Sequence, residues 1–491
     1  MRVSPEPARN PRRVEFGDWQ TPASLAREVV EVVAARLPAP RSIVEPTCGE
    51  GAFLAAASHF PGATRLGFEV SPVHVATARE RLGAQARVEL GNFFELDWPA
   101  ILESLPDPLL LLGNPPWVTN STLGTIAAAN LPIKSNSRPG ALGGLDALTG
   151  KSNFDISEWI VIRLLELVHS RDFTLAMLCK ASVARRVMEQ VAVRKWAIAG
   201  EVRTIDARTH FAAAVDAVLL HVFRGQPSDA AAPRWAVYPT LEATTPTHHM
   251  GVVAGEVFSD LEARSSTCSL AGASTIAWRS GIKHDCAKVM ELTPTNAGFT
   301  NGLGETLQLE REFVFPLLKG SDLANDRLVP RRRVIVPQRK LGEDTRAIRT
   351  RAPLTWRYLE AQRARLDARK SSIYRNQPAF AIFGIGDYAF APYKVAICGL
   401  YKRLKFAVLR PFEGQPIMVD DTAYFLPCTS EDEAETLAAA LASPRAQAFF
   451  EARVFWAAKR PINKALLESL SLEALLREAG ELGEVGEDEA R

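Results

Sequence analysis

The chain turns from a strand into a helix at Val44-Glu45-Pro46-Thr47-Cys48-Gly49-Glu50-Gly51-Ala52-Phe53. Glycine lets the backbone bend sharply and lets a ligand approach it closely, so Gly49 and Gly51 suit a ligand-binding turn. In a parallel sheet such turns lie at the carboxyl edge, where ligands bind in a crevice. The turn therefore predicts a nucleotide-like cofactor. A structural hinge without a ligand is the alternative for a Gly-x-Gly pair taken alone.

Outward from this turn, short β-branched or leucine-rich runs alternate with helical stretches as far as residue 223. This alternation is typical of a parallel sheet covered by helices on both faces. Thr21-Pro22 suits a helix start, with Thr21 as the cap and proline at the first helical position. We therefore expect an α/β, doubly wound, Rossmann-like sheet of seven strands, at residues 42–45, 64–68, 87–90, 109–112, 173–178, 201–205 and 217–223.

The length of 491 residues exceeds what one hydrophobic core supports and predicts two domains. The best linker candidate is the stretch 225–233, so we expect a cofactor-binding domain at 1–230 and a mixed α+β domain at 231–491. Residues 327–375 hold 15 Lys and Arg against 4 Asp and Glu, which suits contacts to phosphates, although a solvated basic face is the alternative. Residues 465–491 hold 8 acids against 2 bases and form an acidic tail.

The composition, with 47% hydrophobic and 23% charged residues, argues against disorder. No apolar run approaches the roughly 20 residues that span a bilayer, and the start is basic and proline-rich without the apolar core of a secretion signal. The six cysteines are scattered and show no metal-binding spacing. We expect a cytoplasmic protein without a membrane segment or a catalytic metal.

Two further strand ends carry residues that suit a nucleoside. Glu69 ends the second predicted strand, just before Val70, and its carboxylate can accept hydrogen bonds from both ribose hydroxyls. Asn92-Phe93 follows the third strand, where an adenine ring would lie. Each is an ordinary strand-end residue by itself, but together with the glycine turn they predict a nucleoside cofactor. The third glycine of the dinucleotide fingerprint is replaced by Leu54, which disfavours a dehydrogenase.

The fourth predicted strand runs directly into Asn114-Pro115-Pro116-Trp117. The prolines stiffen the backbone into a platform beside the cofactor crevice. The Asn114 side-chain oxygen and the Pro115 carbonyl can accept hydrogen bonds from an aromatic amine and aim its lone pair at a sulfonium methyl group, by positioning and electrostatics alone. Trp117 can stack on a base flipped out of a duplex. The alternative is a Pro-Pro turn that ends a strand, with Trp117 packed in the core.

With these motifs, most of the first 225 residues resemble the gamma class of adenine-N6-specific DNA methyltransferases from bacterial restriction-modification systems, the Asn-Pro-Pro-Trp family. The resemblance implies S-adenosyl-L-methionine as the cofactor and a catalytic platform of Asn114, Pro115, Pro116 and Trp117. It implies that Thr21 and Glu45, next to Pro46, contact the methionine part, that Glu69, next to Val70, contacts the ribose, and that Asn92 with Phe93 contacts the adenine. The class usually has Asp in place of Asn92, but an Asn oxygen also accepts, so we expect binding to be retained.

The resemblance continues more loosely beyond this region. Residues 152–158 resemble the motif that opens the helix after the catalytic loop, and Phe211 is a candidate for the second face of the flipped base. In the second half, residues 281–285, 369–374, 385–395 and 420–422 resemble parts of target-recognition domains, where basic and aromatic residues suit double-stranded DNA. The predicted DNA-binding residues are Lys134, Arg138, Lys151, Arg369, Lys370, Tyr393, Lys394, Lys402 and Arg403.

Three other interpretations stay open at the level of sequence. The same platform can serve a methyltransferase of RNA bases or of a protein glutamine. A noncatalytic DNA-recognition subunit of a defence complex can keep the fold. A fused nuclease is less consistent with the chain, so a separate restriction endonuclease or defence-system subunit is the expected partner for any cleavage.

Overall fold

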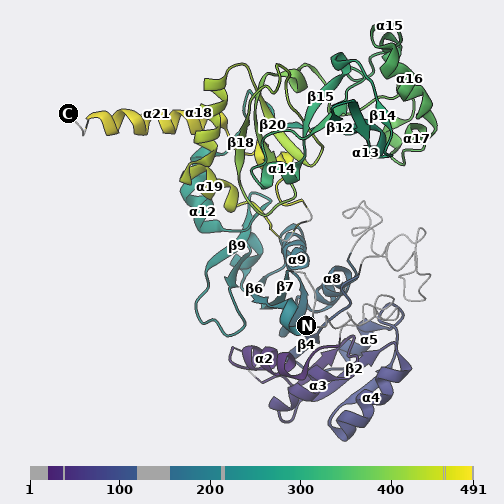
Figure 1. Ribbon diagram of the computed structural model, residues 1–491. Coiled ribbons are helices and arrows are strands. Elements are labelled where there is room, and N and C mark those ends of the chain that lie inside the picture. The colour runs from purple at the N-terminus through teal and green to yellow at the C-terminus, as the bar shows by residue number, and fades with distance from the viewer. Residues whose placement is uncertain are drawn as a thin grey trace, which may run out of the picture. The chain divides into compact units, whose positions relative to one another are not determined.

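The computed structural model describes residues 20–36, 39–118, 155–211, 216–456, 458 and 460–488. The chain divides into two compact units, unit 1 (Met1–Glu262) and unit 2 (Ala263–Arg491) (Figure 1). Among the helices of the described ranges, none is long and apolar enough to cross a membrane.

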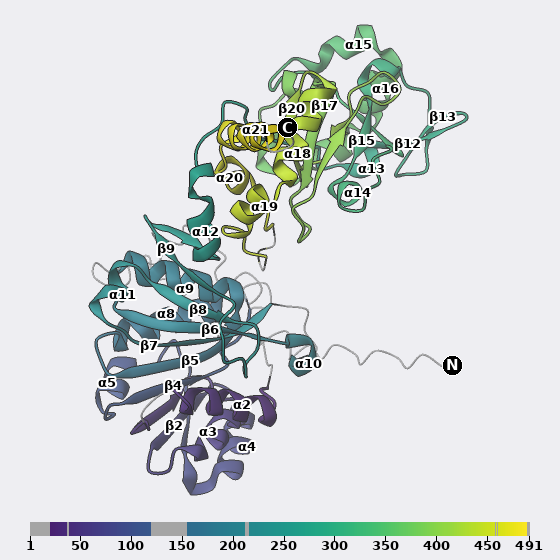
Figure 2. The same cartoon turned by 90° about the vertical axis from the view of Figure 1, so that its left-hand side faces the viewer.

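Unit 1 is built on one ten-stranded sheet in the order β10-β9-β8-β6-β7-β5-β4-β1-β2-β3. The strands β1 to β5 run parallel, and β7 lies antiparallel between β5 and β6. Figure 2 labels β2, β4, β5, β7 and β6 in this order across the sheet, and β1 lies between β2 and β4. The strands are β1 (Ser42–Glu45), β2 (Thr64–Glu69), β3 (Arg87–Leu90), β4 (Leu109–Gly113), β5 (Phe173–Lys180), β6 (Ile198–Ile205), β7 (Ala217–Arg224), β8 (Arg234–Tyr238), β9 (His248–Val253) and β10 (Glu256–Phe258).

The α/β Rossmann-like fold is confirmed, and all seven predicted strands are present. The helices of unit 1 are α2 (Ala23–Ala34), α3 (Ala52–Ala56), α4 (Pro72–Leu82), α5 (Trp98–Glu103), α8 (Ile156–Val168), α9 (Ala181–Val193), α10 (Ala207–Phe211) and α11 (Pro227–Ala231), and α12 (Leu261–Thr267) spans the boundary.

The leucine run of β4 shows why this strand is apolar along its whole length. Leu109 and Leu111 face the core on one side of the sheet, together with α8 and α9. Leu110 and Leu112 face the core on the other side, together with α2 and α3. All four side chains are at most 2% exposed, as expected for a central strand covered on both faces.

The boundary between the units differs from our expectation. We predicted it between residues 230 and 231, but it lies after Glu262. The reason is that β8 pairs in parallel with β6, and β9 and β10 extend the same sheet. Trp235 on β8 is completely buried against unit 1, so residues 231–262 belong to the first core.

The start of α2 also differs from our expectation. The helix begins after Pro22, which occupies the cap position and provides no side-chain cap hydrogen bond. Thr21 therefore does not cap the helix. Its hydroxyl instead contacts the end of β4, as described below.

Unit 2 contains two sheets, in the orders β11-β20-β17-β18 and β14-β13-β12-β16-β15-β19. The first consists of β11 (Arg279–Ser280), β17 (Tyr393–Cys398), β18 (Phe406–Leu409) and β20 (Ala423–Cys428). The second consists of β12 (Glu291–Thr295), β13 (Gly298–Asn301), β14 (Thr306–Leu307), β15 (Val314–Leu318), β16 (Arg332–Ile335) and β19 (Met418–Val419). The helices are α13 (Ala287–Met290), α14 (Gly320–Ala324), α15 (Ile348–Arg351), α16 (Pro353–Ala361), α17 (Arg363–Asp367), α18 (Glu431–Ala442), α19 (Pro444–Glu451), α20 (Lys464–Glu468) and α21 (Leu472–Asp488).

Segments of unit 2 that lie far apart in the sequence cross closely at glycines. A Cβ atom on Gly281 would lie 2.1 Å from the carbonyl oxygen of Asp420, and one on Gly384 would lie 2.2 Å from the carbonyl oxygen of Gly281. No side chain fits at such distances. The segments 281–285, 385–395 and 420–422, which the sequence analysis selected separately, therefore meet in one place.

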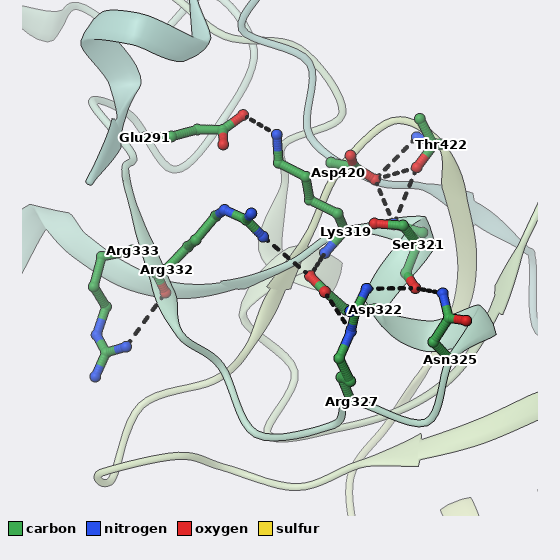
Figure 3. A network of polar contacts seen from close by, with 11 residues as sticks. Glu291, Lys319, Ser321, Asp322, Asn325, Arg327, Arg332, Arg333, Asp420 and Thr422 are labelled. Carbon is green, nitrogen blue, oxygen red and sulfur yellow. Dashed lines mark hydrogen bonds and ion pairs between the residues drawn. The ribbon is translucent and has the colours of Figure 1, made fainter. Parts of the chain in front are cut away.

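A polar network joins the turn after β15 to the turn after β19 (Figure 3). The Asp420 carboxylate accepts from the backbone N–H of Gly320 at 3.1 Å. Asp322 forms ion pairs with Arg327 at 3.3 Å and with Arg332 at 3.4 Å (Figure 3). Several cations of the basic stretch 327–375 are thus already paired within unit 2, and the stretch is less positive at its surface than its sequence suggests.

Candidate active site

The turn after β1 requires glycine at two positions. Gly49 and Gly51 both adopt left-handed backbone conformations, with φ of +49° and +77°. A Cβ atom on Gly49 would lie 2.5 Å from the side-chain oxygen of Gln20, and that oxygen accepts the backbone N–H of Glu50 at 3.0 Å. The turn at Gly49 and Gly51, called here the glycine cradle, is therefore tight, and a side chain at Gly49 would fill the space beside it.

Glu69 at the end of β2 is fixed by two backbone donors. Its carboxylate accepts from the N–H of Gly49 at 2.9 Å and from the N–H of Ser71 at 2.8 Å. A carboxylate has about four acceptor positions, so these two bonds orient Glu69 and leave it able to accept ribose hydroxyls. The adjacent Val70 is 38% exposed, which provides an apolar contact at the same edge.

Glu45 at the end of β1 is an almost completely buried acid. Its side chain is 2% exposed and accepts from the backbone N–H of Leu54 at 3.3 Å. Burial raises the pKa of Glu45 well above its usual value, and the nearby Glu69 carboxylate adds to this effect. A cationic group bound beside Glu45 would reverse the shift, because an opposite charge favours the ionised carboxylate. Pro46 is buried next to it.

The end of β3 presents Asn92 and buries Phe93. The Asn92 side-chain oxygen accepts from the N–H of Phe94 at 3.2 Å, and its amide donates to Glu95 at 3.1 Å. The Phe93 ring is 5% exposed and packs 4.8 Å from the ring of Trp98, measured between centroids. Phe93 therefore lies with its ring in the core, whereas Asn92 lies at the edge of the sheet.

The platform Asn114-Pro115-Pro116-Trp117 follows β4 directly, as predicted. The Asn114 amide nitrogen donates to the Thr21 hydroxyl at 3.3 Å, which joins the start of α2 to the platform. The Trp117 indole N–H donates to the carbonyl of Leu178 at 3.3 Å. Its ring meets Phe211 edge-on, with 5.3 Å between the ring centroids. Phe211 is 5% exposed, so its ring is buried against Trp117 rather than presented at the surface.

Lys180, which the sequence analysis did not select, also contacts the platform, and Asp155 pairs with it. Lys180 at the end of β5 donates to the Trp117 carbonyl at 3.0 Å and forms an ion pair with Asp155 at 2.6 Å. Asp155 lies in the segment 152–158 that the sequence analysis noted, but its partner is 25 residues away. In the sequence, Lys180 is recognisable only as the charged residue that closes an apolar strand. That position indicates a strand end but not a contact with the platform.

The comparisons with known proteins decide the family. No family model matches the chain. The type II methyltransferase M.NspV of Nostoc sp. (strain ATCC 29411 / PCC 7524) is 41% identical over 479 residues, which cover 95% of this chain and 98% of that protein. The chain belongs to the type II methyltransferases. These enzymes use S-adenosyl-L-methionine and modify DNA in restriction-modification systems.

Solved structures also match part of the methyltransferase. TrmN from Thermus thermophilus is 15% identical over 43% of this chain and 52% of that chain, with a TM-score of 0.27. A TehB-like SAM-dependent methyltransferase from Corynebacterium glutamicum ATCC 13032 Kitasato is 13% identical over 40% and 88%, with a TM-score of 0.23. SMU.472, complexed with SAH, is 12% identical over 43% and 56%, with a TM-score of 0.24.

The chemistry of the strand ends in the methyltransferase fits S-adenosyl-L-methionine. The glycine cradle at Gly49 admits a ligand close to the backbone. Glu69 suits the ribose hydroxyls, and the buried Glu45 suits the cationic methionine part. Asn92 suits the adenine amine, although its oxygen already accepts one backbone bond. The same edge holds Thr21, through its contact to Asn114.

The residues predicted to bind DNA fall into three groups in the methyltransferase. Lys134, Arg138 and Lys151 lie outside the described residues. Lys370, Lys402 and Arg403 are exposed in unit 2, and Tyr393 is half-buried. Arg369 and Lys394 have partners within the fold, and each is considered next.

Arg369 and Lys394 are not presented to a ligand in the way that we expected. Arg369 is half-buried, donates to the carbonyl of Ala381 at 2.8 Å and lies over the ring of Tyr374. Lys394 is 1% exposed, and its ammonium donates to the carbonyl of Ala391 at 2.7 Å. A buried ammonium does not reach a phosphate, so the geometry of Lys394 does not support a DNA contact.

Within the ranges that the structure describes, there is no group of three or more His, Cys, Asp or Glu side chains that could hold a metal ion.

Proposed function

We propose that this methyltransferase transfers a methyl group to the exocyclic N6 amine of an adenine flipped out of double-stranded DNA. The observation that carries the proposal is the position of Asn114-Pro115-Pro116-Trp117. The segment follows β4 directly, at the sheet edge where the candidate cofactor-binding residues lie, and the Trp117 indole is held by the carbonyl of Leu178. The relative M.NspV is a type II methyltransferase, which supports DNA as the substrate class.

The platform residues suit this transfer by orienting the amine. The nitrogen end of the Asn114 amide faces the Thr21 hydroxyl, and in the proposed reaction its oxygen is the end that accepts from the adenine amine. The Pro115 carbonyl accepts the second hydrogen, and the amine lone pair then points toward the donor. When bound, S-adenosyl-L-methionine supplies an electrophilic methyl group at this edge. Trp117 stacks on the base and keeps it out of the duplex.

Unit 2 is the target-recognition part in this proposal. Lys370, Lys402 and Arg403 are exposed cations that can neutralise phosphates. Arg369 has a different role, because its bonds to carbonyl groups hold the segment that carries Lys370. The proposal also includes a separate restriction endonuclease or defence-system subunit as a partner, and a cytoplasmic location.

The decisive experiment supplies the full chain with labelled S-adenosyl-L-methionine and, in parallel, double-stranded DNA, structured RNA or protein. The DNA is then digested to nucleosides, and methylated sites in DNA from expressing cells are sequenced. We expect label only in DNA, as N6-methyladenine at one sequence motif. Label in RNA or protein alone, label on the N4 amine of cytosine, or no transfer to any substrate would each overturn the proposal, the last in favour of a noncatalytic recognition subunit.

A further inference from the structure

The platform is not held in place by backbone hydrogen bonds of the sheet. The hydrogen-bond ladder of β4 ends where Gly113 pairs with Met177 on β5. Pro115 and Pro116 have no N–H groups, so they cannot extend that ladder. The orientation of the platform must therefore come from side chains and carbonyl groups. The contact of Asn114 with Thr21 fixes its beginning, and the indole bond of Trp117 fixes one side of its end.

Lys180 fixes the remaining side. Its ammonium donates to the main-chain carbonyl of Trp117 at 3.0 Å. This carbonyl lies on the side of Trp117 that leads to Val118, after the two prolines. The same ammonium forms an ion pair with Asp155 at 2.6 Å. The Lys180 side chain is 25% exposed and that of Asp155 is 12% exposed, so both charges are largely withdrawn from water.

Asp155 connects this pair to a second element. Its other carboxylate oxygen accepts from the N–H of Ser157 at 3.1 Å and from the Ser157 hydroxyl at 2.6 Å, which caps the start of α8. The N–H of Ile156 donates to the carbonyl of Val118 at 3.0 Å. The segment after β4, the end of β5 and the start of α8 are thus joined by the Lys180 ammonium and the Asp155 carboxylate.

An ion pair at such a place is not by itself a sign of added stability. Removing two charges from water costs free energy, and apolar residues of similar size often stabilise a fold equally well or better. What an ammonium adds is a directed hydrogen bond to a chosen carbonyl. The pair is therefore better explained by the orientation that it gives to Trp117 than by the stability of unit 1.

We propose that Lys180 and Asp155 are positioning residues for methyl transfer, called here the platform brace. The brace holds the Trp117 carbonyl, and through the stiff Pro-Pro segment it sets the direction of the Asn114 amide. This inference rests on the proposed function, because it assigns Asn114 to the reacting amine. Misplacement of reacting groups by about 1 Å costs on the order of 100-fold in rate, which sets the scale of the expected effect.

The test compares three variants of the full chain on DNA that carries its mapped target. Lys180→Met removes the charge and the donor, Asp155→Asn removes the charge but keeps an acceptor for Ser157, and Lys180→Arg keeps both charge and donor. The matched control is Arg171→Met, at the opposite end of β5. Arg171 is also a partly buried cation that donates to carbonyl groups, of Leu102 at 2.7 Å and Leu105 at 2.8 Å, and pairs with Asp107 at 2.6 Å.

We expect Lys180→Met and Asp155→Asn to lower kcat by about 10- to 100-fold, with the dissociation constant for S-adenosylhomocysteine within about 3-fold of the parent. Lys180→Arg should recover most of kcat, and Arg171→Met should keep kcat even where its melting temperature falls as far as that of Lys180→Met. A parental kcat in Lys180→Met, or a loss in Arg171→Met that matches it, would overturn the inference. If Asn114→Ala abolishes turnover while Lys180→Met does not, only the brace is wrong. If Asn114→Ala keeps its turnover, the proposed function fails and the brace with it.

Discussion

Asn114 is the single residue on which the proposed chemistry depends most directly. Its side chain lies at the end of β4 and is tied to Thr21, so the amide has a defined direction before any substrate binds. Replacing it with alanine removes an acceptor for the target amine and leaves the cofactor-binding strand ends intact. We expect Asn114→Ala to lower kcat by about 100-fold or more, since a single preorganised acceptor or donor contributes about that much.

Single-turnover kinetics on duplex DNA would measure this loss, with S-adenosylhomocysteine binding as the control for folding. The matched variant is Thr21→Val, which keeps the shape of the residue but removes the hydroxyl that orients Asn114. It should have an intermediate rate. A variant at Asn114 that turns over as fast as the parent chain would contradict the assignment.

Lys394 illustrates a residue whose sequence context misled us. It stands among Tyr and Phe residues in a segment that resembles a DNA-binding part, yet its ammonium is buried below the ring of Phe425. Burial lowers the pKa of Lys394 from 10.5 to about 7. In the unfolded chain the ammonium is in water and keeps its ordinary pKa, so between about pH 7 and pH 10.5 the unfolded state binds more protons and stability rises with pH.

We therefore expect Lys394→Met to unfold at a higher temperature than the parent at pH 6 and to lose this rise in stability between pH 7 and pH 10. Thermal unfolding across that range measures both effects. The control is Lys464→Met, an exposed lysine paired with Glu468 at 3.2 Å, which should change stability little. Because Lys394 is buried, DNA affinity should be unchanged in Lys394→Met and should fall in Arg403→Ala. Equal losses of affinity in these two variants would restore Lys394 as a DNA contact.

At the scale of elements, β6 and β7 share a buried charge network that the mechanism does not use. Glu201 on β6 is 2% exposed and pairs with Arg203 at 2.8 Å, with Arg36 at 2.9 Å and with the ring nitrogen of His221 at 3.0 Å. Burial alone would raise the pKa of Glu201, but the hydrogen bonds from His221 and Arg203 outweigh it and set the pKa at about 2. This depressed pKa means that the ionised carboxylate stabilises the folded state.

The stability from Glu201 is present above its unfolded pKa of 4.5 and is lost as the pH falls toward about 2. Breaking a buried pair by removing one charge costs about 3 to 5 kcal/mol, because Arg203 is left uncompensated. We expect Glu201→Gln to lower the free energy of unfolding by that order at pH 7 and to flatten its dependence on pH between 4.5 and 3. Urea unfolding at a series of pH values measures this. The exposed Glu468→Gln, which loses a pair with Lys464 at 3.2 Å, should cost under about 1 kcal/mol. An equal cost in both variants would contradict the buried-network explanation.

The elements near the site could be predicted because their signals are local. The bounds of β1 and β3 agree with the sequence prediction, since each is a short strand closed by a glycine-containing turn. β8 was not predicted, because Arg234–Tyr238 is short and its only sign of belonging to the sheet is its pairing with β6. The Lys180–Asp155 pair was missed for a related reason: its partners lie 25 residues apart, and no periodicity in the sequence connects them. The accessibility of the basic residues could not be predicted either. Arg369, Lys394 and Lys402 are all basic residues in the sequence, but Arg369 is half-buried, Lys394 is buried and Lys402 is exposed.

At the scale of the whole molecule, the position of the unit boundary can be tested by truncation. A fragment of residues 1–230 lacks β8 to β10 and would expose the β6 edge together with the apolar surface that Trp235 covers. Unpaired strand edges and exposed apolar surface promote aggregation. We expect fragment 1–262 to melt cooperatively and to bind S-adenosylhomocysteine, and fragment 1–230 to aggregate. Circular dichroism and gel filtration provide the measurements, and equal behaviour of the two fragments would restore the earlier boundary.

The location of the described site residues within unit 1 has a consequence for the timing of synthesis. Every described residue of the candidate active site lies between Gln20 and Phe211, and the cradle, the platform and the brace need no residue after Glu262. Domains fold one after another as the ribosome releases them, at about 5 to 20 residues per second, so unit 2 emerges over roughly 10 to 50 seconds after unit 1. During that interval each nascent chain carries the candidate active site without unit 2, the proposed target-recognition part. Under the proposed function, any methyl transfer in that interval would occur without target recognition by unit 2, and faster translation would shorten the interval.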